Sequence, residues 1–204
     1  MITVALAKGR LAQKATELLE KCGLGLDELK VETRKLVLFD DSGKYRFVFV
    51  KPSDVPTYVE RGVADFGVVG KDTLLEADKD IYEIVDLKFG ACRLCVCGYP
   101  DSLEKAGGVL RVGTKYPHVT KEYFGSRGKT VDIIKLSGSV ELGPVMGLSD
   151  VIVDIVESGK TLEANGLKVL EEVCNCSARL VVNRVSLKTK KELAPLFDKI
   201  RANV

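Results

Sequence analysis

Short apolar runs alternate with segments of helical periodicity along most of this chain. The run at residues 2–7 (ITVALA) precedes a segment whose apolar side chains recur every three or four residues and stop at Gly23. The side chains on this helical face are Leu11, Ala15, Leu18, Leu19 and Cys22. Strands that alternate with helices form mainly parallel sheets, whose ligand sites lie at the carboxyl ends of the strands. The pattern therefore predicts an α/β fold with mainly parallel mixed sheets.

The alternation occurs in two series, which predicts two α/β lobes. In the first series, KLVLF and YRFVFV flank the turn DDSG and are expected to form a hairpin, and Ser53 is expected to cap a helix. A second series begins after Gly90, and the C-terminal segment predicts a strand followed by a helix capped by Ser186. We expect one lobe to comprise residues 1–89 and 181–204, and the other residues 90–180.

Charge and hydropathy exclude several classes of function. The chain has 204 residues, and its 31 basic and 29 acidic residues are mixed along it, so the sequence contains no basic stripe for nucleic acid. No apolar run approaches the roughly 18 residues of a membrane span, and the N-terminus lacks a signal-peptide pattern. The sequence therefore predicts a cytoplasmic protein that binds neither nucleic acid nor membrane.

The six cysteines allow two interpretations. Five of them lie in ACRLCVCGYP and EEVCNCSARL, and their thiolates could bind zinc. Their spacing does not give two CxxC knuckles, however, and free cysteines are often small buried side chains. We therefore expect buried cysteines on strands and no protein-held metal.

The segment VIVDIVESGKTLEANGL, residues 151–167, ends its strand in a phosphate-loop-like turn. A P-loop would have glycine five positions before Gly159, but this chain has Asp154 there, where the carboxylate would repel polyphosphate. A carboxylate at the end of a strand can instead accept hydrogen bonds from two vicinal sugar hydroxyls. Ser158, Thr161 and the glycine turn can bind a phosphate. The segment therefore predicts a sugar-phosphate site, with a P-loop NTPase or an ordinary turn as the alternatives.

The two lobes contain similar segments. DFGVVGKDTLLE and VDIVESGKTLEA both run from a strand through Gly, Lys, Thr and Leu into a helix. If the likeness is structural, each lobe offers a helix N-terminus and a lysine to an anionic ligand. The sequence would then favour two anionic ligands in a cleft between the lobes.

Several segments together resemble the ATP phosphoribosyltransferases of histidine biosynthesis. The matching segments, in the order of the family, are LAKGRL, TRKLVLF, PSDVPTYVERGVADFGVVGKD, GTKYP, IKLSGSVELGP, DVIVDIVESGKTLEANGL and SARLVVN. The resemblance covers nearly the whole chain. It implies a two-lobed fold similar to type II periplasmic binding proteins, with an active site in the interlobe cleft.

The resemblance also implies a reaction, a cofactor and partners. The family is a group of glycosyltransferases that transfer the 5-phosphoribosyl group of phosphoribosyl pyrophosphate to N1 of ATP, with substrate-bound Mg²⁺, and release pyrophosphate. The chain is similar to the short form of the family. Such short chains form homodimers within a hetero-octamer that contains a histidyl-tRNA-synthetase-like regulatory subunit. The alternative is a two-lobed small-molecule binding protein without catalysis.

The resemblance assigns candidate site residues in three groups. Those expected to bind phosphoribosyl pyrophosphate are Asp154, Glu157, Ser158, Gly159, Lys160 and Thr161. Those expected to bind ATP or pyrophosphate are Lys8, Gly9, Arg10, Gly70, Lys71 and Tyr116. Those expected to act in catalysis are Lys51, Arg34 and Glu141. Lys51 departs from the arginine that the family has before PSDVP, and a lysine offers a point charge without the bidentate geometry of arginine.

Overall fold

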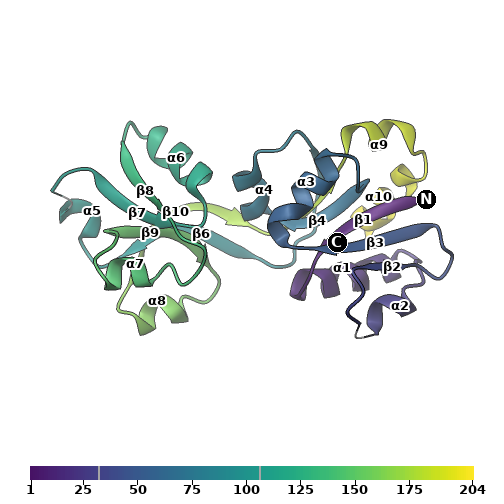
Figure 1. The fold of residues 1–204 in the computed structure, drawn as a ribbon, viewed down its shortest axis with the longest axis horizontal. Coiled ribbons are helices and arrows are strands. Elements are labelled where there is room, and N and C mark those ends of the chain that lie inside the picture. Colours follow the sequence, from purple (N-terminus) through teal and green to yellow (C-terminus); the bar gives the residue numbers. More distant parts are fainter. Residues whose placement is uncertain (32, 106) are drawn as a thin grey trace. The chain divides into compact units, whose positions relative to one another are not determined.

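The protein is described by a computed structural model covering residues 1–31, 33–105 and 107–204. The chain forms two compact units, one comprising residues 1–90 and 177–204 (unit 1) and the other residues 91–176 (unit 2). The chain thus leaves unit 2 at Cys176–Ser177, slightly before the position expected from the sequence. Each unit has its own sheet and its own apolar core (Figure 1).

Unit 1 contains a six-stranded mixed sheet. Its strand order is β2 (Val37–Phe39), β3 (Tyr45–Val50), β1 (Ile2–Ala7), β4 (Phe66–Gly70), β11 (Ala178–Val182) and β5 (Tyr82–Asp86). Strand β1 is parallel to β3 and β4, whereas the β2–β3, β4–β11 and β11–β5 pairs are antiparallel. The carboxyl ends of the three central strands therefore lie at one edge of this sheet.

Helices cover both faces of the sheet in unit 1 because the central strand β1 is apolar on both faces. Val4 and Leu6 pack with helices α1 (Arg10–Lys21) and α10 (Leu193–Ala202), while Ala5 and Ala7 pack with α3 (Val55–Glu60) and α4 (Lys71–Ala77). The remaining helices are α2 (Asp27–Lys30), the short 3₁₀ helix η1 (Pro52–Asp54) and α9 (Arg184–Thr189).

Unit 2 contains a five-stranded mixed sheet. Its strand order is β10 (Lys168–Cys176), β6 (Cys92–Gly98), β9 (Val151–Val156), β7 (Leu110–Thr114) and β8 (Val131–Lys135). Strand β7 is parallel to β8 and β9, whereas β6 is antiparallel to β9 and β10. The helices are α5 (Ser102–Lys105), α6 (Pro117–Gly125), α7 (Leu142–Val145) and α8 (Lys160–Ala164).

The two α/β units confirm the predicted fold class, although fewer strand pairs are parallel than the sequence suggests. In unit 1 the antiparallel pairs come from a hairpin and from the returning strand β11. In unit 2 they come from the entering and leaving strands β6 and β10. Strands that carry the chain into and out of a unit have no crossover helix, so they are free to pair antiparallel.

Two predicted helix caps are wrong. Ser53 lies in η1 and forms no capping hydrogen bond, and Pro56 lies in the first turn of the separate helix α3. The cap of α9 is Asn183, whose side chain accepts hydrogen bonds from the amides of Val185 and Ser186. The Ser186 hydroxyl instead donates to Asp65 at 2.6 Å, because this distant carboxylate is buried next to it.

Candidate functional site

Three predicted site residues lie near or after the carboxyl ends of the parallel strands of unit 2. Tyr116 comes shortly after β7, Glu141 comes between β8 and α7, and Asp154 lies near the end of β9. The register pairs Thr114 of β7 with Val153 of β9. The Thr114 hydroxyl donates to the Val153 carbonyl at 2.6 Å and accepts from the Tyr116 amide at 2.8 Å, which fixes this edge next to Asp154.

The residues of the predicted sugar-phosphate loop all line one cavity of unit 2. Its volume is about 260 Å³, and its lining residues are Cys97, Glu141, Ile152, Asp154, Ile155, Val156, Glu157, Ser158, Gly159, Lys160, Thr161 and Leu162. This cavity is therefore lined by acidic side chains, two hydroxyls and one ammonium group, together with apolar side chains. The structure brings Glu141 to this loop, although the two are separated by strand β9 in the sequence.

The turn after β9 depends on Gly159. This residue has φ of 76°, in the left-handed region that glycine adopts without strain, and it precedes the first residue of α8. Ser158 and Lys160 lie at the protein surface beside it, so their side chains and the first helical amides are accessible to a ligand. Helix α8 has only five residues, so the glycine turn and its amides contribute more to anion binding than the dipole of this helix.

Asp154 and Cys97 lie on the same side of the sheet, at the cavity. Asp154 is half-buried, and Cys95 is its direct partner on β6. Burial, the nearby Cys95 thiol and the carboxylates of Asp154 and Glu141 together raise the pKa of Cys97 to about 12. Cys97 is therefore a neutral thiol in the lining of the cavity. The sequence did not indicate this position, because a pairing of β6 with β9 leaves no local signal.

Predicted site residues of unit 1 meet at the edge of its parallel strands. Lys8 follows β1 and Lys51 follows β3, and the Lys8 amide donates to the Val50 carbonyl at 3.4 Å. Both lysine side chains are exposed. Two positive charges therefore lie at the ligand edge of this sheet without burial.

The N-terminus of α1 is the better anion site in unit 1. Gly9 precedes this 12-residue helix with φ of 107° and ψ of −158°, a conformation essentially restricted to glycine. The first turn contains no acidic residue, and Arg10 is its exposed first residue. The helix dipole, the first helical amides and two basic side chains thus favour an anion here.

Gly70 and Lys71 have a different environment. The Lys71 ammonium group forms an ion pair with Glu83 at 2.5 Å, and Glu83 also binds Arg179. A Cβ atom on Gly70 would clash with the Asp72 carboxylate, so a negative group already lies at the start of α4. The likeness between the GKDT and SGKT segments therefore extends to a glycine followed by a helix, but not to the electrostatics of the two turns.

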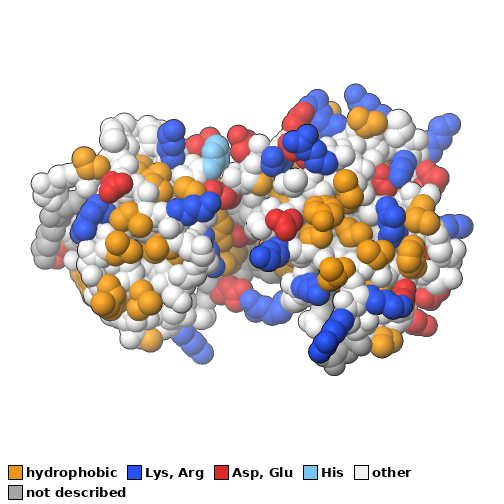
Figure 2. All heavy atoms as spheres, in the orientation of Figure 1, with side chains coloured by type: hydrophobic (Ala, Val, Ile, Leu, Met, Phe, Trp, Pro, Cys, Tyr) orange, Lys and Arg blue, Asp and Glu red, His pale blue; other side chains and the backbone are white. Residues whose placement is uncertain are grey.

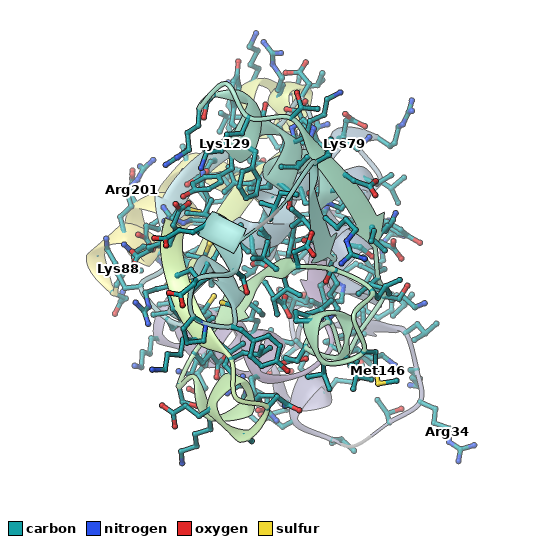
Figure 3. The ribbon with its side chains drawn as sticks, turned by 90° about the vertical axis from the view of Figure 1, so that its left-hand side faces the viewer. Arg34, Lys79, Lys88, Lys129, Met146 and Arg201 are labelled. Carbon is teal, nitrogen blue, oxygen red and sulfur yellow. The ribbon has the colours of Figure 1, made fainter. Side chains whose placement is uncertain are left out.

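Arg34 and Tyr116 differ in exposure. Arg34 precedes β2 and is exposed, and Figure 3 shows its side chain pointing away from the ribbon. Tyr116 is only 8% exposed and lies directly before α6. The sequence neighbours of Arg34, Thr33 and Lys35, line one cavity of unit 1 together with Lys8 and Gly9, whereas Arg34 is not among the described residues of that lining.

The described part of the chain contains neither a metal cluster nor a membrane span. Within residues 1–31, 33–105 and 107–204, no three His, Cys, Asp or Glu side chains are placed to hold a metal ion. No helix in those same ranges is both long and apolar enough to cross a membrane. Four of the six cysteines are buried and two are half-buried, and none of the six is in a disulfide. Figure 2 shows basic and acidic side chains interspersed over the visible face.

Comparisons with known proteins agree with this geometry. Residues 51–202 match the family model described as HisG: ATP phosphoribosyltransferase. An ATP phosphoribosyltransferase of Lachnospira eligens is 56% identical over 195 residues, which cover 94% of this chain and 90% of that protein. One from Clostridioides difficile is 53% identical over 192 residues, covering 94% of this chain and 92% of that protein.

Solved structures with a similar fold include a member of the same family and a periplasmic domain. The ATP phosphoribosyl transferase (HisG:HisZ) complex from Thermotoga maritima is 36% identical with a TM-score of 0.83, and the match covers 99% of this chain and 97% of that chain. The periplasmic VFT2 domain of Bordetella pertussis BvgS is 12% identical with a TM-score of 0.62, covering 100% and 87%. The latter likeness concerns the fold alone and agrees with the expected binding-protein-like architecture. On the sequence and structural matches together, this chain belongs to the ATP phosphoribosyltransferase family.

Proposed function

We propose that this chain transfers the 5-phosphoribosyl group of phosphoribosyl pyrophosphate to N1 of ATP, giving phosphoribosyl-ATP and pyrophosphate, the first step of histidine biosynthesis. The observation that carries the proposal is the cavity in unit 2 where Glu141, Asp154 and the ESGKT turn meet. Its donors and acceptors match a ribose 5-phosphate.

Unit 2 is the phosphoribosyl pyrophosphate side in this proposal. Asp154 and Glu157 accept hydrogen bonds from the ribose hydroxyls, while the Gly159 turn binds the 5-phosphate through its amides. Lys160 and the hydroxyls of Ser158 and Thr161 complete the phosphate site. The support is that all these groups line one cavity of about 260 Å³.

Unit 1 is the ATP side. Lys8, Gly9 and Arg10 bind phosphate groups at the N-terminus of α1, and Lys51 adds a charge from the next strand. The lack of an acid in the first turn of α1 supports this assignment. Arg34, Gly70, Lys71 and Tyr116 remain predicted site residues from the resemblance. For Lys71, substrate would have to compete with its ion pair to Glu83.

The reaction needs charge stabilisation more than proton transfer. Cleavage of the bond between C1 and pyrophosphate builds positive charge on the ribose and negative charge on the leaving group. The Glu141 carboxylate at the cavity stabilises the first charge, and cations such as Lys51 stabilise the second. Adenine N1 already has a lone pair, so no general base is required, and holding both substrates in place supplies much of the acceleration.

Mg²⁺ fits this site as a companion of the substrate rather than as a resident ion. Mg²⁺ commonly keeps several waters and binds substrate phosphates with one or two carboxylates. The described residues offer no metal cage, but the cavity contains Asp154 and Glu141 as carboxylates. When bound, the ion would neutralise pyrophosphate charge.

The similar protein from Thermotoga maritima suggests a partner for this chain. That protein forms a HisG:HisZ complex. We extend this to a HisZ-type, histidyl-tRNA-synthetase-like regulatory subunit for this chain, in a hetero-octamer that contains homodimers of it. The cytoplasmic location predicted from the sequence belongs to the same proposal.

The test follows the ultraviolet absorbance change on N1 ribosylation of ATP, with Mg²⁺ and both substrates, with and without a HisZ-type subunit. Product that requires both substrates is the expected result. Binding of both ligands without turnover, even with the regulatory subunit, would favour a passive binding protein. ATP hydrolysis without the sugar substrate, abolished by Lys160→Ala, would favour a P-loop NTPase.

A further inference from the structure

Three of the six cysteine thiols gather at one end of unit 2. Cys92 is the first residue of β6 and Cys176 is the last residue of β10, and the two are direct partners in the antiparallel register. Their thiols are hydrogen-bonded. The Cys174 sulfur lies 3.8 Å from the Cys176 sulfur.

This thiol cluster is separate from the sugar-phosphate cavity. Because side chains alternate along a strand, Cys92 and Leu94 lie on one face of the sheet, whereas Cys95 and Cys97 lie on the other, which carries the cavity. The cluster also lies beside both points where the chain passes between the units, at Gly90–Ala91 and Cys176–Ser177. A covalent bond there would join the two connections.

The geometry favours one pair of thiols. Directly opposed residues in an antiparallel pair have Cα atoms about 4.5–5.5 Å apart, inside the usual range for disulfides. Cys174 and Cys176 are two residues apart on one strand, which gives about 6.5 Å between Cα atoms, at the upper end of that range. No described group of three ligands could hold a metal, so a two-thiol reaction fits better than zinc.

We propose that Cys92 and Cys176 form a reversible disulfide by exchange with a low-molecular-weight disulfide such as oxidised glutathione. The half-buried Cys92 reacts first, since Cys176 is only 3% exposed. Its thiolate attacks one sulfur of the reagent, the reagent's S–S bond breaks, and one small thiolate leaves. The Cys176 thiolate then attacks the Cys92 sulfur and expels the second small thiolate. Two protein thiols are oxidised, and one reagent disulfide is reduced to two thiols.

The environment keeps the pair reduced until an oxidant is present. The hydrogen bond with Cys92, burial and the nearby Cys174 thiol together raise the pKa of Cys176. Thiolate is the reactive form, so the protonated pair is stable in a reducing compartment. This inference is independent of the proposed catalytic activity.

Peptide mapping tests the pairing on the full chain. The folded protein is incubated with oxidised glutathione, alkylated, and digested with trypsin without reductant. Cleavage after Lys88, Arg93, Lys168 and Arg179 gives FGACR and VLEEVCNCSAR. The expected product is these two peptides joined, and dithiothreitol should separate them. Cys174→Ser and the distant control Cys22→Ser should keep the joined product, and Cys176→Ser should lose it.

Three results would overturn the proposal. One is the absence of the joined peptides at every ratio of oxidised to reduced glutathione. Another is a disulfide confined to VLEEVCNCSAR, which would identify Cys174–Cys176 as the pair. The third is an undiminished joined product in Cys176→Ser. Circular dichroism of each variant shows whether it is folded. If Cys176→Ser does not fold, the Cys174→Ser variant still tests which thiols pair.

Discussion

Asp154 is the residue on which the proposed chemistry of unit 2 depends most. Its carboxylate lies in the cavity where a ribose would offer two hydroxyl donors. Asp154→Asn removes the charge and replaces one acceptor oxygen by a donor, and hydrogen bonds to charged groups contribute about 1.5–3 kcal/mol. We expect the Kd for phosphoribosyl pyrophosphate to rise about tenfold or more and the Kd for ATP to change little, as measured by isothermal titration calorimetry. Equal weakening of both ligands would contradict the assigned role.

Substitutions of Gly159 can distinguish the effect of backbone strain in this turn from the effect of side-chain bulk. A Cβ atom there would contact only Val156, at 4.0 Å, so space is available and the left-handed φ of 76° is the main constraint. This conformation costs other L-residues roughly 1–2 kcal/mol, but asparagine tolerates it better. Gly159→Ala should weaken phosphoribosyl pyrophosphate binding about five- to thirtyfold, and Gly159→Asn should weaken it less. If asparagine were as damaging as alanine or worse, bulk in the phosphate position would be the cause.

A buried carboxylate holds α9 and the residue after it, Lys190, against the sheet of unit 1. Asp65 is 4% exposed and accepts hydrogen bonds from the Thr3 amide at 2.7 Å and from Ser186 and Lys190, each at 2.6 Å. Lys190→Met leaves this charge without its cation. We expect the free energy of unfolding to fall by about 1–3 kcal/mol in urea titrations. The neighbouring exposed Lys191→Met should change it by less than about 0.5 kcal/mol.

The side-chain contacts of Asp86, which join the end of β5 to the start of β11, should stabilise the protein less at low pH. Burial disfavours the Asp86 carboxylate, but hydrogen bonds from Ser177 and Lys88 and the charge of Arg179 outweigh it and lower the pKa of Asp86 to about 2. A depressed folded-state pKa stabilises the protein above the unfolded value near 4, and this stabilisation is lost as the pH falls from about 4 to 2.

Asp86→Asn isolates this contribution. At neutral pH the variant should be less stable than the wild type by on the order of 1 kcal/mol, after allowing for solvent screening. The difference in free energy of unfolding, measured in urea at several pH values, should shrink below pH 4. A constant difference between pH 5 and pH 2 would contradict the assigned pKa.

Local patterns predicted the elements that depend on neighbouring residues only. Strand β1 and helix α1 follow from an apolar run and a helical stripe, and the structure places them at Ile2–Ala7 and Arg10–Lys21. The α9 cap was mispredicted because Asn183 and Ser186 are both capping residues, and Asp65, far away in sequence, decides between them. Propensity alone contains no such information.

Only those parts of the site that are contiguous in the sequence could be predicted. The sugar-phosphate turn is contiguous, so its residues could be identified from ESGKT and the preceding acid. Cys97 could not, because its place in the cavity depends on the register of β6 against β9. The engagement of Lys71 with Glu83 depends on the packing of α4 near β5 and is likewise invisible in the sequence.

At the scale of the whole molecule, the division of the chain makes a further prediction. Unit 2 is one continuous segment, residues 91–176, with its own sheet and an apolar core around Ile152. Unit 1 is assembled from two segments, Met1–Gly90 and Ser177–Val204. A continuous unit with its own core can in principle fold alone, although a domain of this size is only marginally stable.

We therefore expect a fragment of residues 91–176 to fold cooperatively and to bind ribose 5-phosphate, because the whole predicted sugar-phosphate cavity belongs to this unit. Thermal unfolding followed by circular dichroism should show a transition that shifts upward with ligand, since a ligand that binds only the folded state stabilises it by mass action. The same fragment with Asp154→Asn should unfold at a similar temperature but respond less to the ligand. A folded fragment with no response would mean that unit 1 supplies contacts without which the sugar phosphate does not bind, and the role of the cavity would then have to be revised.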